Sequence, residues 1–324
     1  MFRYIVKRIL SLIPVVFIIS LVLFGMFKLM PGDPVLMMMP TTLKTETQRQ
    51  QMYDVYAKRL GLDKSIPEQY VAWVVNTTKG DFGYSSTYNR PVADVLKEPL
   101  KNSIALNVFS LFFSFMISIP VGIKSAVKRH SFFDSFWQVF SLVGLSIPTF
   151  FIGLGLIFFI AIKLRLLPAG GMPFMLDKSS ATYLLAWGRY LILPVATLTI
   201  GDLAGTIRYV RNAMLDIIGR DYIRTARSKG LGEKVVIYSH AFRNALIPVT
   251  TLVSGSLVAL FGGAAITETI FAWNGIGNVL IQALNSRDYM VVLTMNMFYA
   301  ILSLIANLIM DIGYALVDPR VKLD

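Results

Sequence analysis

Few residues in this chain could do chemistry, and they form no catalytic constellation. The sequence has no G-x-x-x-x-G-K-[ST] phosphate-binding loop, no H-E-x-x-H zinc motif and no G-x-S-x-G nucleophile motif. It contains no cysteine, and its two histidines, His130 and His240, lie far apart in the sequence. We therefore expect no bound metal, no cofactor and no enzymatic activity in this chain.

One carboxylate, Asp202, falls inside an otherwise apolar run. An ionisable residue in a membrane span is energetically costly and is by default a functional hypothesis. Arg208 and Arg211 follow six and nine residues later, within about three helical turns. A local ion pair at the membrane boundary and a proton relay both stay open, and we favour the ion pair.

The most patterned segment is a basic loop that reads GRDYIRTARSKGLG from Gly219 to Gly232. Asp221 suits the N-cap of a short helix, and Gly230 suits the left-handed residue that ends it. Lys229 in the last turn complements the helix dipole.

The spacing in this loop also predicts which residues share a face. Tyr222 and Ala226 are four residues apart and should share one face, whereas Arg224 and Arg227 point elsewhere. A second helical stretch should follow Gly232. By spacing alone, two interpretations stay open: a rigid element that transmits force from a soluble partner, and a basic loop that rests on lipid headgroups.

The elements that position this loop are membrane spans. Of the 324 residues, 55% are hydrophobic and only 15% are charged, compared with about a quarter charged in soluble domains. Each apolar run is long enough to cross about 30 Å of hydrocarbon. The six expected spans are 9–27, 104–123, 136–162, 190–207, 245–267 and 289–310.

Charge sets the expected orientation. The net charge of +12 resides largely in loops, which favours contact with anionic membrane lipid over nucleic acid, and we expect no nucleic-acid partner. The long 208–244 loop is the richest in Lys and Arg, so it should be cytoplasmic. With six spans, both termini are then cytoplasmic, and the first span is expected to remain uncleaved.

The sequence therefore predicts an all-α membrane protein with about six transmembrane helices, a cytoplasmic surface helix and a small extracytoplasmic element. The expected parts are an N-terminal span at 1–30, a folded extracytoplasmic segment at 31–101, a core transmembrane domain at 102–312 that includes the loop 213–247, and a cytoplasmic tail at 313–324.

The basic loop resembles the EAA loop of permeases from ATP-binding-cassette importers, in particular their oligopeptide, dipeptide and nickel branch. The shared pattern is Asp221-Tyr222-x-Arg224-Thr225-Ala226-Arg227-x-Lys229-Gly230-Leu231, followed by His240-Ala241-x-Arg243-Asn244-Ala245-x-Ile247-Pro248. Thr225-Ala226 stands at the Glu-Ala-Ala core. Other stretches agree along the whole chain, among them Pro31-Gly32-Asp33-Pro34, Gly80-Asp81-Phe82-Gly83 and Glu268-Thr269-Ile270-Phe271.

This resemblance implies a machine of several chains in the cytoplasmic membrane. A homologous second permease subunit would complete the pathway, two cytoplasmic ATP-binding subunits would each receive one surface helix, and an extracytoplasmic binding protein would deliver a peptide-like substrate. ATP hydrolysis would belong to the partner chains. The nine residues of the EAA-like pattern from Asp221 to Leu231 are the implied ATPase-coupling site.

Alternatives stay open at this level. An ion- or proton-coupled secondary transporter would need repeats and buried ionisable groups in its spans. An importer permease for dipeptides, nickel chelates or another small solute would share the same scaffold. Polar residues of the later spans that could line the pathway are Thr251, Ser254 and Asn296.

Overall fold

Helices make up nearly all of the regular structure in the computed structural model. It describes residues 2–29, 35–36, 39, 45–59, 62–174, 180–245, 256, 260, 262 and 264–317. Among these residues the strands are β1 (Tyr84–Ser85) and β2 (Arg90–Pro91), which pair antiparallel with Tyr84 opposite Pro91. The expected all-α class is confirmed.

Four helices of the described part are long and apolar enough to cross a membrane. They are α1 (Phe2–Leu29), α5 (Val92–Val127), α8 (Ala181–Ile218) and α14 (Tyr289–Val317). A bent helix pair makes a fifth span if it is counted as one. The expected span at 245–267 lies mostly outside the described residues, so the number six stays a prediction.

The bent pair corrects the expectation of one tilted helix over 136–162. Helix α6 (Phe132–Ser146) is followed by α7 (Thr149–Leu156), which continues as the π-helix η1 (Ile157–Lys163), and the two parts meet at 101°. Pro148 explains the break, because proline has no N–H to donate and disfavours helical geometry in the residue before it. Ile147 accordingly adopts φ −90° and ψ 122°.

The chain divides into two compact units, each of which is described by itself. The first comprises residues 1–5, 100–278 and 305–324, and the second comprises 6–99 and 279–304. The first unit also contains α9 (Asp221–Ser228), α10 (Glu233–Val235), the π-helix η2 (Val236–Phe242) and α12 (Ala265–Ile270).

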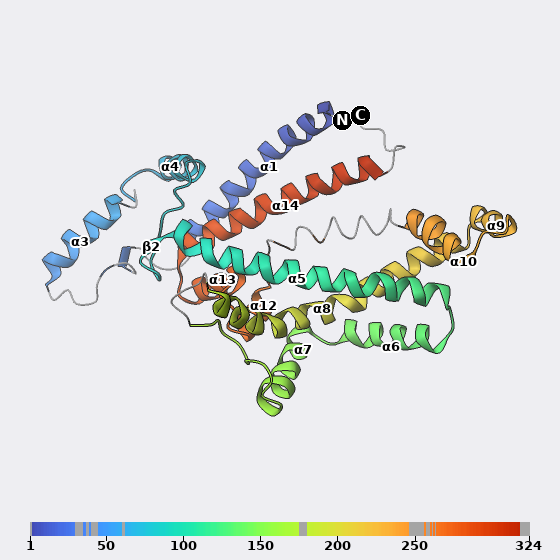
Figure 1. Cartoon of the computed structure of the whole chain (residues 1–324). Helices are drawn as coiled ribbons and strands as arrows, with labels where there is room; N and C mark the ends of the chain where they lie inside the picture. Colours follow the sequence, from blue (N-terminus) through green and yellow to red (C-terminus); the bar gives the residue numbers. More distant parts are fainter. Residues whose placement is uncertain are drawn as a thin grey trace. The chain divides into compact units, whose positions relative to one another are not determined.

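Long helices of the first unit run alongside one another (Figure 1). Ser180 caps α8 by accepting a hydrogen bond from the backbone N–H of Tyr183 at 3.1 Å. Helix α6 approaches α8 so closely that a Cβ atom on Gly144 would lie 2.9 Å from the Cβ of Ala204. Small residues at such crossings allow close helix packing in lipid.

A buried ion pair also joins α6 to α8. Arg211 donates from Nε and Nη2 to the two carboxylate oxygens of Asp134, at 2.6 and 2.8 Å, and both side chains are buried. The favoured pairing of Asp202 with Arg208 or Arg211 is therefore wrong for Arg211. Among the described residues, Asp202 forms no ion pair, and it lies exposed on α8.

The second unit contains most of α1, α3 (Glu46–Arg59), α4 (Ile66–Thr78), the strand pair and most of α13 (Ile276–Asn285). Tyr70 and Trp73 of α4 pack against Phe24 of α1, with ring centroids 5.4 and 5.7 Å apart. The described residues of the polar segment after α1 thus include the helices α3 and α4, of which α4 packs against α1. That 31–101 forms one folded extracytoplasmic element stays a prediction.

Asp288 fixes the strand pair of this unit. Its buried carboxylate accepts hydrogen bonds from the Ser85 hydroxyl and from the backbone N–H of Thr87, the latter at 3.1 Å. The same carboxylate accepts from the backbone N–H of Val291 at 3.4 Å in the first turn of α14. One side chain therefore caps a membrane helix and holds the hairpin.

The Asp134–Arg211 pair should be a major contributor to stability in detergent. We expect Asp134→Leu to lower the free energy of unfolding by about 3–5 kcal/mol, because it leaves the Arg211 guanidinium buried without its partner. Thermal and denaturant unfolding of the purified chain measure this loss.

A double variant and an exposed pair provide the controls for this prediction. Asp134→Leu combined with Arg211→Met should recover most of the loss, because no unpaired charge then remains. Glu233→Gln, which breaks the exposed pair with Arg227, should leave the unfolding midpoint nearly unchanged. An Asp134→Leu variant as stable as the parent would show that this pair does not hold α6 to α8.

Candidate functional site

The surface helix predicted in the basic loop exists as α9, and it is strongly amphipathic. Arg220, with φ −78° and ψ 150°, is the N-cap, so the expected N-cap Asp221 lies instead in the first helical turn. There its carboxylate still complements the positive end of the helix dipole. Ile223 and Ala226 are buried, and the other residues of α9 are exposed.

The buried face differs from the expected one. Tyr222 was predicted to share a face with Ala226, but 46% of its surface is exposed, whereas Ile223 is fully buried. The apolar stripe therefore has the i, i+3 spacing of Ile223 and Ala226. About half of Tyr222 is accessible, so it can contact a partner.

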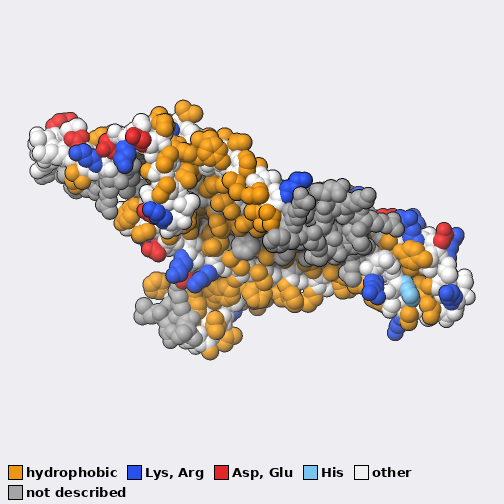
Figure 2. Space-filling view, turned by 90° about the horizontal axis from the view of Figure 1, so that it is seen from above, with side chains coloured by type: hydrophobic (Ala, Val, Ile, Leu, Met, Phe, Trp, Pro, Cys, Tyr) orange, Lys and Arg blue, Asp and Glu red, His pale blue; other side chains and the backbone are white. Residues whose placement is uncertain are grey.

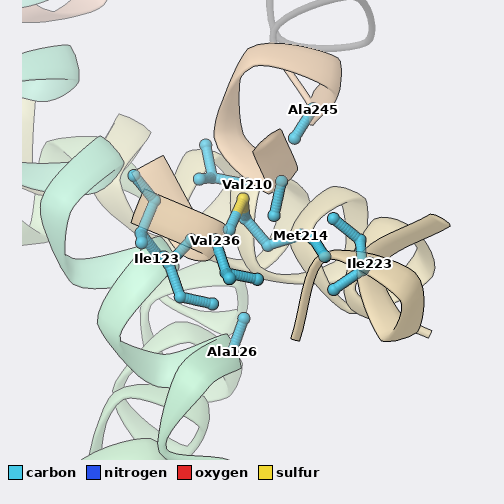
Figure 3. Packing of buried hydrophobic residues seen from close by; sticks show 10 residues of the cluster. Ile123, Ala126, Val210, Met214, Ile223, Val236 and Ala245 are labelled. Atoms are coloured by element: carbon cyan, nitrogen blue, oxygen red, sulfur yellow. The ribbon is translucent and has the colours of Figure 1, made fainter. Parts of the chain in front are cut away.

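A hydrophobic cluster attaches α9 to two long helices. Figure 3 shows Ile223 lying beside Met214 of α8, with Val210, Ile123 of α5 and Val236 of η2 in the same cluster. Each of these side chains is almost completely buried. Because close-packed interiors transmit strain, a displacement of α9 must be felt at α5 and α8.

The turn after α9 has the predicted left-handed glycine. Gly230 adopts φ +76°, and its backbone N–H donates to the carbonyl oxygen of Arg227 at 2.9 Å. The space around a Cβ atom at Gly230 is open. The requirement for glycine is therefore one of backbone conformation rather than of room.

An exposed ion pair ties α9 to the second helical stretch. Arg227 donates from Nε and Nη2 to the two carboxylate oxygens of Glu233, at 3.1 and 2.7 Å. The hydrogen bond from Arg227 lowers the pKa of the Glu233 carboxyl, so this pair stays charged at neutral pH. Beyond it, η2 buries Val236, Ile237 and Ala241 against the same cluster as α9.

The nine predicted coupling residues are brought together on one small element. Ala226 is the anchor among them, and the exposed ones are Asp221, Tyr222, Arg224, Thr225, Arg227, Lys229, Gly230 and Leu231. Lys and Arg side chains gather around the end formed by α9 and α10 (Figure 2). The exposed face thus combines positive charge with an aromatic and an aliphatic side chain, a composition suited to a protein groove.

Sequence reasoning missed the principal anchor, Ile223. The only signal for it was an apolar residue three positions before a small one, in a helix of eight residues. Sequence reasoning also missed the ion pair of Glu233 with Arg227, although their separation of six residues across a tight turn could have predicted it.

A buried carboxylate fixes the segment that follows 245–267. Glu268 accepts hydrogen bonds from the Ser103 hydroxyl at 2.6 Å and from the backbone N–H groups of Ala264 and Asn278, at 3.2 and 3.0 Å. The Ser103 oxygen in turn accepts from the backbone N–H of Ile276 at 2.9 Å. Both carboxylate oxygens are occupied, so Glu268 positions a turn on α5 and is not a free acid or base.

The pathway candidates are only partly described. Thr251 and Ser254 lie outside the described residues. Asn296 is exposed on α14, and its amide donates to the carbonyl oxygen of Val292 at 2.8 Å. Asn107 of α5 is buried and donates to the carbonyl oxygen of Leu260, which is the interhelical role expected of a span asparagine.

The described residues hold no group of three or more His, Cys, Asp and Glu side chains that could bind a metal ion. The candidate site is an exposed helix that an apolar cluster and a tight turn attach to two long helices, an arrangement suited to transmitting movement.

Two protein-family models match the chain and together cover nearly all of it. Residues 118–323 match the family described as binding-protein-dependent transport system inner membrane component, and residues 1–107 match its N-terminal companion family. Helix α9 and the turn after it lie in the larger of the two matches.

Individual relatives match along the full length. The oligopeptide transport system permease protein AppB of Bacillus subtilis is 37% identical over 99% of this chain and 100% of its own. The dipeptide transport system permease protein DppB of Escherichia coli K12 is 35% identical over 99% of each chain. An inward-facing structure of the MetNI methionine ABC transporter shares the fold, with a TM-score of 0.50 and 21% identity over 69% of this chain and 94% of that one.

Docking of α9 against the cluster should depend on the buried Ile223 rather than on its exposed neighbour Tyr222. Ile223→Ala should release α9 from the cluster, because truncating a buried isoleucine costs about 2–5 kcal/mol. Tryptic cleavage after Arg224 or Arg227 in solubilised protein should then accelerate by about 30-fold or more. Tyr222→Ala, next to it but exposed, should leave the cleavage rate unchanged, and equal acceleration by the two variants would contradict the assigned face.

Proposed function

The chain belongs to the binding-protein-dependent transport system inner membrane component family, and we propose that it forms one half of the peptide pathway of an ATP-driven importer. The full-length match to permeases named for oligopeptide and dipeptide transport supports peptides as the substrate class. A secondary transporter that works alone finds no support in these relatives.

The observation that carries this proposal is the attachment of α9. The element is exposed on the face that carries Tyr222 and Arg224 and is buried at Ile223 and Ala226, against helices that cross the membrane. A soluble subunit that holds the exposed face can therefore move α5 and α8. This is the geometry that a force-transmitting loop needs, and a loop that merely rests on headgroups does not need it.

Membership of this family implies the partners. The resemblance to importer permeases implies two cytoplasmic ATP-binding subunits, each of which holds one such helix in a surface groove. Hydrolysis by these subunits fits a chain that carries no phosphate-binding loop. A homologous second permease completes the pathway between the two chains. An extracytoplasmic binding protein delivers the peptide to the side opposite α9.

Orientation is part of the same proposal. The chain lies in the cytoplasmic membrane with both termini and the loop 213–247 in the cytoplasm. The segment 31–101, which contains α3, α4 and the strand pair, lies outside.

Gly230 provides the sharpest test of coupling. Gly230→Val should insert and express, because insertion depends on the spans, yet valine disfavours a φ of +76° by about 1–2 kcal/mol. The competent loop geometry should then be about 5- to 30-fold less populated. We expect peptide-stimulated ATP hydrolysis and transport to fall together by a comparable factor in the reconstituted complex.

Gly232 is a matched control two residues away. It has φ −61° and ψ 141°, which any residue adopts, and open space around its Cβ position. Gly232→Val makes the same chemical change in the same loop and should retain most of the activity. Normal transport by Gly230→Val, or equal loss in both variants, would remove the assigned role of the turn.

Cysteine labelling tests the orientation. The exposed positions Lys79, just after α4, and Ser228, at the end of α9, should differ when changed one at a time to cysteine. An impermeant maleimide applied outside intact cells should label Lys79→Cys but not Ser228→Cys, whereas both should react in opened membranes. Labelling of Ser228→Cys from outside would refute the proposed topology.

A further inference from the structure

A cleft of about 390 Å³ with a mixed polar and apolar lining opens between α5, α6 and α8 of the first unit, and the proposed coupling role does not explain it. Its volume is in the range of small-molecule sites. The polar and aromatic residues of its lining that matter here are Ser125, Trp137, Ser141, Arg208, Arg211 and Asn212.

Two of these residues are buried hydroxyls without a hydrogen-bond partner. Ser125 and Ser141 are 0% and 3% exposed, and neither Oγ atom has a partner in the described part of the chain. A buried hydroxyl without a partner is costly, so both groups call for one. Both residues line the same cleft, so its wall contains two buried hydroxyls without a protein partner among the described residues.

The charge of the cleft is positive. Arg211 binds Asp134 through Nε and Nη2, which leaves its Nη1 for another acceptor. Arg208 is exposed and forms no ion pair with the described residues. The two arginines carry two positive charges and Asp134 one negative charge, which leaves one net positive charge at the cleft. Together with the serines, the arginines can donate hydrogen bonds to phosphate oxygens.

The surroundings of the cleft are apolar. On α6, Phe136, Val139, Leu142 and Val143 are each about half exposed or more. The cleft lies near helix ends, because Ser125 precedes the end of α5 by about 3 Å of helix and Trp137 follows the start of α6 by about 8 Å. Tryptophan at this depth is typical of the membrane interface.

We propose that this cleft binds the phosphate of an anionic phospholipid, with its acyl chains along the exposed face of α6. Arg208 supplies the unpaired positive charge, and Arg211 Nη1, Ser125 and Ser141 donate to phosphate oxygens. A free phosphate ion would satisfy the same donors but would leave the apolar strip on α6 uncovered, and on this ground the lipid is favoured.

Native mass spectrometry of the purified transporter complex tests this assignment. The complex is taken from nanodiscs in which phosphatidylglycerol is titrated into phosphatidylcholine, and retained phosphatidylglycerol is counted. Arg208→Gln should weaken retention about tenfold or more, because it removes a charge-assisted contact. Ser141→Ala removes one oxygen atom, should fold normally, and should weaken retention several-fold.

Arg129→Gln is the matched control, since Arg129 is exposed in the α5–α6 loop and does not line the cleft. It makes the same charge change on the same side and should retain the lipid normally. Equal retention in Arg208→Gln and Arg129→Gln would overturn the proposal.

Two further outcomes identify other occupants of the cleft. Arg208-dependent binding of radiolabelled inorganic phosphate in pure phosphatidylcholine, without selective retention of phosphatidylglycerol, would overturn the lipid as its source. A photoreactive residue at Val139 should crosslink to lipid, and crosslinking to the second permease subunit instead would also refute the proposal.

Discussion

The contact between the buried face of α9 and the cluster on α5 and α8 is the interaction on which the functional argument depends. An isolated helix of eight residues is unstable in water, because nucleation costs more than so few hydrogen bonds return. It exists here because Ile223 and Ala226 are removed from water against Met214 and Val210. The same packing that makes α9 a helix therefore also attaches it to α5 and α8, so its stability and the force transmission that we propose for it have one origin.

Buried charge in the first unit follows a second constraint. Asp134 and Glu268 are both almost inaccessible, and each has its oxygens occupied by donors from distant parts of the chain. In an apolar environment such groups are tolerated only with partners, so they fix which segments lie together. Asp134 determines how α6 meets α8, and Glu268 determines how the turn before α13 meets α5. Both carboxylates therefore act in the structure as acceptors that join distant segments.

The parts of the structure that rest on short-range rules were predictable. The left-handed Gly230 and the helical stretch after Gly232 follow from local backbone preferences, and the long helices follow from hydropathy. Failures occurred where distant partners decide. Arg211 pairs with Asp134, 77 residues away, rather than with the nearby Asp202. On α9, Ile223 rather than Tyr222 is buried, because other helices set the shape of the cluster that receives it. The sequence signals the break through Pro148, but the length of the apolar run led to the prediction of one span over 136–162.

Helix α8 carries both the coupling contact and the proposed lipid contact. Val210 and Met214 face the cluster that holds α9, while Arg208 and Arg211 face the cleft. A helix is rigid over a single turn, because each peptide group is bonded to the next turn. These two sets of residues therefore cannot move independently when α9 is displaced. If the ATP-binding subunits move α9 as we propose, the same motion would change the cleft around a bound headgroup, so an anionic lipid bound there would favour one position of α8 over another. By linkage, the state of the ATP-binding subunits would then change the lipid affinity by the same factor as the lipid changes that state.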